Sequence, residues 1–379
     1  MSRPRVAPSA RYDRVIDKRS GIAVRWFRWE LAVTNDVDRH VGRFRRKIFR
    51  SGGIAAAAVL LVIAGIWIGF AGGRSARIAG ITTCGSQLCF EGEPWPLAVG
   101  TVYNGLDEPD NAVAAVEALN LDVVRITDFL DTAGAPATAP YDAKAWRSVD
   151  RLIASAGRAG LHVELDFSTY RNLLKQSGVN PYGVDWLPFL RFVASRINTE
   201  TGTQYADDPT IALISFAGEV DGINGGDNSY GLTTAQLTGF YRTVENFWHE
   251  AAPGQLLTAG GLSQLSWNSG IDWRAIFSLP HNDIDSLHAY TSGDVAITVP
   301  AVAEFSRSKG KPWIIEEFGF PAELPDRERA DKFAKMFETA RSQGAAGIGL
   351  WNVGDQTTDT YDVGPQFPLT FEAVRTRVL

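Results

Sequence analysis

Two glutamates, far apart in the chain, carry the clearest chemical signal in this sequence. Glu317 stands near the end of the run KPWIIEEFGF, and Glu219 stands near the end of IALISFAGEVDG. Each follows a short apolar, β-branched run typical of a buried parallel strand, so we expect each at the C-terminal end of a strand. Two carboxylates facing each other across such ends can divide the roles of acid and nucleophile, which cleavage of a glycosidic bond requires.

The elements that would position these glutamates form a regular pattern from residue 95 onward. Eight apolar runs, each followed by a helix candidate, cover residues 97–102, 123–126, 162–167, 211–216, 256–259, 284–289, 313–315 and 347–350. The clearest helical stretches, several opened by Asp, Ser, Thr or Pro, are 142–159, 184–198, 233–252, 300–309 and 327–343. Strand-helix alternation predicts a parallel sheet, and eight units predict closure into a (β/α)8 TIM barrel.

A doubly wound open sheet is the alternative fold. It commonly carries a glycine-rich phosphate turn, GxGxxG, after its first strand, and GTVYNGLDEP at that position does not match. The sequence also lacks a phosphate loop and a cluster of His and carboxylates at metal spacing. We therefore expect an α/β barrel with no cofactor and no metal.

Charge is divided unevenly along the chain. Residues 1–50 hold 14 Lys or Arg against 5 Asp or Glu, a balance of +9, so the rest of a chain at −6 carries −15. Residues 54–71, IAAAAVLLVIAGIWIGFA, are an uncharged stretch of 18 residues. As a helix this stretch is about 27 Å long, just enough to span a bilayer. A basic cluster directly precedes it, so the positive-inside rule places the N-terminus in the cytoplasm and the large C-terminal part outside.

We interpret residues 51–73 as an uncleaved signal anchor, which makes this a single-pass protein of the cell membrane. A cleaved signal peptide is the alternative, but its charged leader is short, whereas some fifty residues come first here. The predicted organisation is a cytoplasmic basic leader (1–50), the anchor (51–73), a linker with a disulfide-clipped hairpin (74–94) and an extracytoplasmic barrel (95–379). In the leader, RWFRWELAV fits an interfacial helix on anionic lipid and a disordered basic tail equally well.

The only two cysteines, Cys84 and Cys89, lie in TTCGSQLCF on the predicted outer side of the membrane. An oxidising compartment permits a disulfide, and the short loop between them suits a hairpin clip. Two cysteines without a nearby histidine supply too few ligands for a metal site. We expect a structural disulfide.

Composition fits one large folded domain, with 45% hydrophobic and 21% charged residues. The 11 Trp, 10 Tyr and 20 Phe include aromatic faces of the kind that hold sugar rings, although many must be core. Basic residues concentrate beside the predicted membrane segment and the remainder is acidic, which argues against nucleic-acid binding. We expect a monomer.

The motifs of residues 80–379 resemble glycoside hydrolase family 5, the cellulase and β-mannanase group of barrels whose catalytic glutamates close strands four and seven. CFEGEPWPLAVGTVYN resembles the entry hairpin and first strand, and VVRIT resembles the second strand with its arginine, Arg125. DSLHAY resembles the sixth strand with His288 and Tyr290. WIIEEFGF resembles the seventh strand, where glutamate precedes Phe-Gly, and GIGLWN resembles the eighth, ending in Trp351.

The resemblance implies roles for these residues. Glu219 would be the general acid and base, and Glu317 the nucleophile of a retaining double displacement. Arg125 would keep Glu317 ionised, while burial and the second carboxylate would keep a proton on Glu219 near neutral pH. We expect Tyr290 and His288 to hydrogen-bond the nucleophile and the acid. The expected sugar contacts are a flat apolar face from Trp351 and, as weaker candidates, hydroxyl contacts from Asp166, Tyr103 and Asn104.

Two features depart from a simple match. Adjacent residues of a strand point to opposite faces, so Glu316 would replace Glu317 as nucleophile if Glu316 faced the barrel axis; the Glu-Phe-Gly match favours Glu317. The family ordinarily has asparagine before the acid, bonded to the sugar 2-hydroxyl, and proline after it, but here they are Gly218 and Val220. Candidates to replace the lost hydrogen bond are Asp128, Asp166 and Asn224, the last in the glycine-rich run DGINGGDNSYG.

Two functions from different classes follow. The first is a membrane-anchored, extracytoplasmic retaining glycosidase that acts on a β-linked polysaccharide or oligosaccharide, by hydrolysis or transglycosylation. The second is a catalytically inactive barrel that binds glycan or scaffolds the cell envelope. The missing asparagine is the feature that keeps the second hypothesis open.

Overall fold

The computed structural model describes residues 80–103, 105–127, 129–130, 136–220, 230–262 and 270–379. The predicted leader and membrane anchor lie outside these ranges, as do Asn104, Asp128 and Asn224. Among the described helices, none is both long and apolar enough to cross a membrane.

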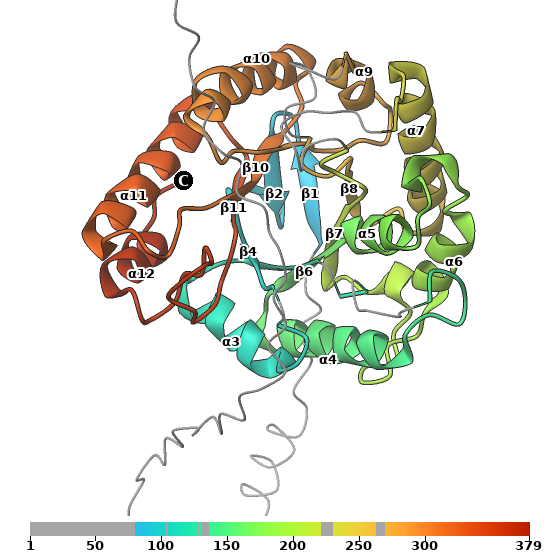
Figure 1. The fold of residues 1–379 in the computed structure, drawn as a ribbon, viewed down its shortest axis with the longest axis horizontal. Helices are drawn as coiled ribbons and strands as arrows, with labels where there is room; N and C mark the ends of the chain where they lie inside the picture. Colours follow the sequence, from blue (N-terminus) through green and yellow to red (C-terminus); the bar gives the residue numbers. More distant parts are fainter. Residues whose placement is uncertain (1–79, 104, 128, 131–135, 221–229, 263–269) are drawn as a thin grey trace, which may run out of the picture. The chain divides into compact units, whose positions relative to one another are not determined.

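Eight parallel strands form the predicted barrel (Figure 1). Their bounds agree within one residue with the predicted runs, except that β10 continues through Glu316 and Glu317 to Phe318. Neighbours pair in the order β8-β7-β6-β5-β4-β11-β10-β9. Backbone hydrogen bonds link the two end strands, from Asp283 N to Leu257 O (2.8 Å) and from Leu262 N to Ser286 O (3.2 Å). The strands are β4 (Leu97–Thr101), β5 (Val123–Ile126), β6 (His162–Asp166), β7 (Ile211–Ser215), β8 (Leu256–Thr258), β9 (Asp285–His288), β10 (Trp313–Phe318) and β11 (Gly347–Leu350).

Helices surround the strands, and the five clearest helical predictions are all present (Figure 1). The stretch predicted at 184–198 is longer than the helix observed, because the chain becomes extended at Arg196 and Ile197 bridges to Gln204. Within the described ranges, the α-helices are α3 (Pro109–Ala118), α4 (Ala143–Ala159), α5 (Ser168–Gln176), α6 (Leu187–Ser195), α7 (Thr234–Ala251), α9 (Trp273–Phe277), α10 (Val299–Lys309), α11 (Asp326–Gln343) and α12 (Pro368–Arg375). Short 3-10 turns lie at Pro181–Gly183 and Tyr205–Asp207, and a π-helical turn lies at Asp294–Thr298.

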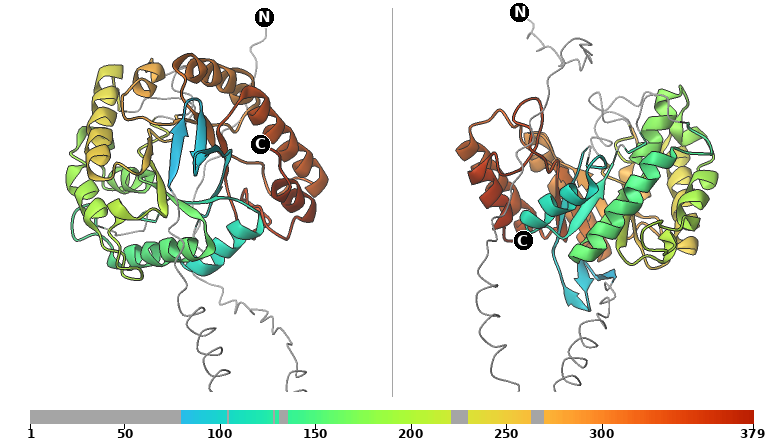
Figure 2. Two further views of the ribbon diagram at one scale, coloured as in Figure 1. Left: turned by 180° about the vertical axis from the view of Figure 1, so that it is seen from behind. Right: turned by 90° about the horizontal axis from the view of Figure 1, so that it is seen from below.

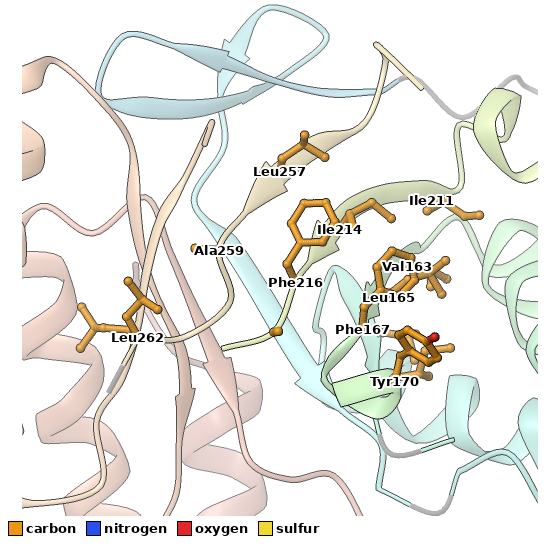
Figure 3. Close-up of a cluster of buried hydrophobic side chains, with 14 of the residues drawn as sticks. Val163, Leu165, Phe167, Tyr170, Ile211, Ile214, Phe216, Leu257, Ala259 and Leu262 are labelled. Carbon is orange, nitrogen blue, oxygen red and sulfur yellow. The ribbon is translucent and has the colours of Figure 1, made fainter. Parts of the chain in front are cut away.

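Side-chain alternation along the strands builds two apolar layers. On β6, Val163 and Leu165 belong to the large core between the strands and the helices, together with Ile214 of β7 and Leu257 of β8 (Figure 3). A smaller cluster, which includes Leu213 of β7, fills the barrel interior near the N-terminal ends of the strands. The polar residues that alternate with Val163 and Leu165 on β6 therefore face the barrel interior.

A small antiparallel sheet covers the N-terminal end of the barrel. It consists of β1 (Ile81–Cys84), β2 (Gln87–Phe90) and β3 (Glu93–Pro94), and it projects from one end of the barrel in Figure 2. Ile81 and Leu88 join the interior apolar cluster, so the sheet seals this end with apolar side chains. Cys84 and Cys89 form the predicted disulfide across the hairpin.

Candidate active site

The predicted residues meet at the opposite, C-terminal end of the strands. A cavity of about 280 Å³ opens there, near the lower end of the range of about 300–1,000 Å³ found for small-molecule sites. Both glutamates that the sequence singled out line it. The lining residues are Arg125, Thr127, Asp166, Ser168, Arg171, Asn172, Ser215, Gly218, Glu219, Gly261, His288, Tyr290, Glu317 and Trp351.

Glu317 is held by two donors, one on each carboxylate oxygen. Nη1 of Arg125 donates to Oε1 at 2.5 Å, and the hydroxyl of Tyr290 donates to Oε2 at 2.8 Å. Burial and the neighbouring charge of Glu317 raise the pKa of Tyr290 well above its ordinary value, so this hydroxyl keeps its proton. Glu317 is 6% exposed. The site therefore holds the carboxyl group of Glu317 in a fixed orientation at the cavity wall.

Arg125 organises the floor of the cavity. It is fully enclosed, with Nη2 hydrogen-bonded to Asp166 and Nη1 also donating to Thr101 Oγ1 at 3.1 Å. Burial opposes the charge, but surrounding carboxylates, Asp166 and Glu317 foremost, raise the pKa of Arg125 well above its ordinary value. Arg125 thus stays charged, and it lies beside Glu317. Asp166 is engaged by Arg125 and by the amide of Ser168 (2.7 Å), which leaves it a poorer candidate for sugar contact.

Glu219 lies on a turn beyond its strand rather than on the strand itself. β7 ends at Ser215, and Glu219 has a left-handed φ of 52°. A non-glycine residue in this region carries local strain, which is commonly found at functional sites. The amide of Glu219 donates to the carbonyl of Gly261 at 3.2 Å, which fixes the turn against the segment after β8.

His288 connects Glu219 and Glu317. Its Nδ1 lies 2.7 Å from Oε1 of Glu219 and 3.4 Å from Oε2 of Glu317, and its Nε2 lies 3.0 Å from Oε2 of Glu316. Burial opposes a charged ring, but the three carboxylates raise the pKa of His288 well above its ordinary value. The predicted contact between His288 and the acid is present.

The expectation that burial keeps a proton on Glu219 is wrong for the free protein. Burial does raise the pKa of Glu219, but the hydrogen bond and the charge of His288 outweigh it and lower the pKa to about 2. The proton that Glu219 would need as an acid therefore resides on His288 Nδ1, one hydrogen bond away. Such a coupled pair titrates as a unit rather than as two independent groups.

Glu316 does not point away from the barrel axis, although strand alternation predicts that it should. The pairing of β10 shifts register between Ile315 and Glu317, so the strict alternation of side chains is interrupted here. Glu316 is fully buried beneath the cavity, where it accepts from the amide of Gly261 and contacts His288. Glu317, not Glu316, lines the cavity.

Close backbone contact explains the glycine at residue 218, where the resemblance to family 5 leads us to expect asparagine. A Cβ at Gly218 would lie 2.6 Å from the carbonyl carbon of Gly260 and 2.8 Å from the amide nitrogen of Gly261. A Cβ at Gly261 would in turn lie 1.7 Å from the ring of His288. The segment after β8 thus occupies the space that a side chain at residue 218 would need.

One oxygen of Glu219, one oxygen of Glu317 and one nitrogen of His288 all lie within 4.8 Å of one another. This spacing would also suit a metal ion. However, both ring nitrogens of His288 face carboxylates, which favours a proton-sharing arrangement. Chemically, the site presents one carboxyl group held by Arg125 and Tyr290 and a second one hydrogen-bonded to the imidazole of His288.

The remaining predicted contacts are distributed at the rim. Trp351 lines the cavity, and its ring packs against that of Tyr103 with centroids 5.4 Å apart. Tyr103 is 40% exposed, so the pair forms a partly open aromatic face. Sequence reasoning missed Arg171, Asn172 and several small polar residues of the wall. These residues lie on helix α5, at the end of a strand or directly after one, and match no motif.

Comparison with solved structures shows a common fold. The endo-1,4-β-mannanase of Rhizomucor miehei aligns with a TM-score of 0.65 and 19% identity over 78% of this chain and 98% of that chain. The endo-β-1,4-mannanase of Thermotoga petrophila aligns with a TM-score of 0.59 and 16% identity over 75% of this chain and 77% of that chain. A glycoside hydrolase family 5 mannosidase of R. miehei, as the E301A mutant, aligns with a TM-score of 0.59 and 13% identity over 78% of this chain and 97% of that chain. No family model and no curated protein matches this chain.

These similarities establish that the barrel has the fold of family 5 mannanases and mannosidases, as the motifs indicated. At such low identity they bear on the fold alone, and the chemistry has to be inferred from the site.

Proposed function

We propose that this protein is a retaining glycoside hydrolase that cleaves a β-linked glycan. The observation that carries this proposal is the convergence of Glu219 and Glu317 on one cavity, with oxygens within 4.8 Å of each other. An upper limit of 4.8 Å for one oxygen of each group fits the separation of about 5–5.5 Å in retaining enzymes better than that of about 6.5–9.5 Å in inverting ones. The similarity of the fold to mannanases and mannosidases supports a glycan substrate.

In this mechanism Glu317 attacks the anomeric carbon while Glu219 protonates the departing oxygen. Arg125 and Tyr290 hold the carboxyl group of Glu317 in position before the attack. Before the leaving group departs, the proton on His288 Nδ1 crosses its 2.7 Å hydrogen bond to Glu219. Glu219 then removes a proton from water, and that water releases the sugar from Glu317.

The same proposal places the enzyme at the cell membrane with its barrel outside the cytoplasm. Its support is the apolar stretch 54–71, the basic cluster before it, and the Cys84–Cys89 disulfide, which is typical of an oxidising compartment. Labelling of single cysteines on either side of the stretch in intact cells tests this orientation.

Hydrolysis of an aryl β-glycoside panel, β-mannosides and β-glucosides first, tests the activity. We expect turnover by the wild-type chain and a loss of at least about a thousandfold in Glu317→Gln, because the amide cannot act as nucleophile. Proton NMR of the first product formed should show the β-anomer. An α-anomer would contradict retention.

The inactive glycan-binding barrel is favoured by one observation, the glycine at residue 218 where the family's transition-state hydrogen bond would originate. That function would be supported if the protein hydrolysed no glycoside of the panel but bound manno- or gluco-oligosaccharides, and if Trp351→Ala abolished this binding.

A further inference from the structure

A carboxyl group that the proposed mechanism does not use lies buried in the barrel below the cavity. Glu164 is on β6, between Val163 and Leu165, and it is 0% exposed. Within the described residues, neither of its carboxyl oxygens receives a hydrogen bond. Nε of Arg125 lies 3.3 Å from Oε1 but is not aligned as a donor. A buried carboxylate without donors is energetically unfavourable, because it has lost its hydration and gained no hydrogen bond in return.

Glu316 meets Glu164 from across the barrel. Its Oε2 is occupied by the amide of Gly261 and by His288, whereas its Oε1 receives no hydrogen bond from any described residue. The two carboxyl groups lie within hydrogen-bonding reach of each other. Two carboxylates in contact in a dry interior cannot both stay ionised. One proton between them supplies the donor that both groups lack.

The surroundings decide which group carries that proton. Burial, followed by the charge of Glu316, raises the pKa of Glu164 well above its ordinary value. Burial acts on Glu316 as well, but Arg125 and His288 more than offset it and hold the pKa of Glu316 below its ordinary value. The other charged or titratable groups that face this pair or its neighbours are Arg125, Asp166, Arg171, Glu219, Tyr241, His288 and Glu317.

We propose that Glu164 is a protonated carboxylic acid at neutral pH, that it donates this proton to Glu316, and that it thereby acts as a positioning residue for His288. Donation to Oε1 of Glu316 draws negative charge away from Oε2. Oε2 then attracts the Nε2 proton of His288 less strongly, and the proton shared over the 2.7 Å contact between His288 and Glu219 is released more readily to Glu219.

The protonation state can be measured without any assumption about activity. The infrared spectrum of the full chain at neutral pH should contain the carbonyl band of a protonated, buried carboxylic acid that disappears in Glu164→Gln. Glu245→Gln is the matched control. Glu245 is buried on α7, none of the described residues donates to its carboxyl oxygens, and burial raises its pKa well above its ordinary value. This control should remove a different band and leave that of Glu164 in place.

Persistence of every acid band in Glu164→Gln would overturn the proposal. It would show that Glu164 is ionised and acts as a further counter-charge to Arg125.

The link to His288 rests on the proposed function and is tested with two substitutions of similar volume. Glu164→Met removes the donor, so kcat/KM for a substrate with a poor leaving group should fall by about tenfold, since that step needs the acid. A dinitrophenyl glycoside, which departs without protonation, should be affected much less. Glu164→Gln retains an N–H donor toward Glu316 and should restore most of the difference.

Equal losses on both substrates would contradict the positioning role and indicate a purely structural one. If the wild-type chain hydrolysed no glycoside at all, the proposed function would fail while the infrared result on Glu164 would still stand.

Discussion

Three glycines surround the turn that carries Glu219. Gly260 has a φ of 81°, and a Cβ there would lie 2.8 Å from the amide nitrogen of Gly218 and 2.9 Å from the carbonyl of Phe216. The backbones after β7 and β8 therefore touch without intervening side chains. The asparagine that the family resemblance led us to look for is sterically excluded.

Substitution at Gly218 should be destabilising even when the new side chain is small. We expect Gly218→Ala to lower the free energy of unfolding by about 1–3 kcal/mol, because the added Cβ must displace backbone rather than a flexible side chain. The matched control is Gly239→Ala on α7, where the Cβ meets nothing within 4 Å, and a helical alanine should add about 0.5–1 kcal/mol. Chemical denaturation measures both. Equal stability of the two variants would contradict the close contact.

Glu219 should make stability depend on acid pH. Its pKa falls from 4.5 to about 2 on folding, so its ionised form stabilises the fold above its unfolded pKa, and that contribution is lost as the pH falls from 4.5 toward 2. In Glu219→Gln the free energy of unfolding should therefore decline less over this interval than in the wild type. Glu338→Gln, on the exposed surface of α11, controls for the loss of a carboxylate. If the free energy of unfolding changed with pH in the same way in the wild type and in Glu219→Gln, the contact with His288 would be contradicted.

At the scale of elements, the strands could be predicted because each is a short apolar run that ends where polar residues begin. The placement of Glu316 could not, because the register shift in β10 depends on pairing with β9 and β11 rather than on local sequence. Glu164 did leave a signal, since a charged residue inside a buried strand is rare unless it is paired. Its partner, Glu316, lies on the opposite side of the barrel, so the sequence around Glu164 does not predict the contact.

A buried network ties α4 to the segment that follows α6. Asp150 on α4 is 0% exposed, and it accepts from Arg196 at 2.8 and 2.5 Å and from the hydroxyl of Tyr205 at 2.7 Å. These hydrogen bonds fix the chain directly after α6, where the observed helix ends earlier than the sequence predicts.

Removal of the Asp150 carboxylate should destabilise this junction between α4 and the segment after α6. We expect Asp150→Ala to cost about 3–5 kcal/mol, because it leaves the largely buried guanidinium of Arg196 without its carboxylate. Asp110→Ala, which breaks the exposed contact with Arg151, should have a far smaller effect. Urea denaturation of both variants gives the comparison, and similar losses would mean that burial does not govern the strength of these pairs.

At the scale of the whole molecule, residues 74–379 form one compact unit, and the described members of both apolar clusters and of the cavity wall lie within it. A chain that starts at residue 80 should therefore fold by itself, with a Tm within about 2 °C of the full-length protein, and should retain kcat/KM on soluble glycosides. Calorimetry and the aryl glycoside assay measure these quantities. A large drop in Tm or in kcat/KM would show that the residues before residue 80 contribute to the fold or the site.

The disulfide-clipped sheet that closes the N-terminal end of the barrel has a practical consequence. The chain enters the barrel at the end opposite the cavity, so an immobilisation tag joined there would leave the cavity mouth open to the medium. Beads or electrodes coated through that end should present their sites outward, accessible even to polymers too bulky to diffuse between the molecule and its support.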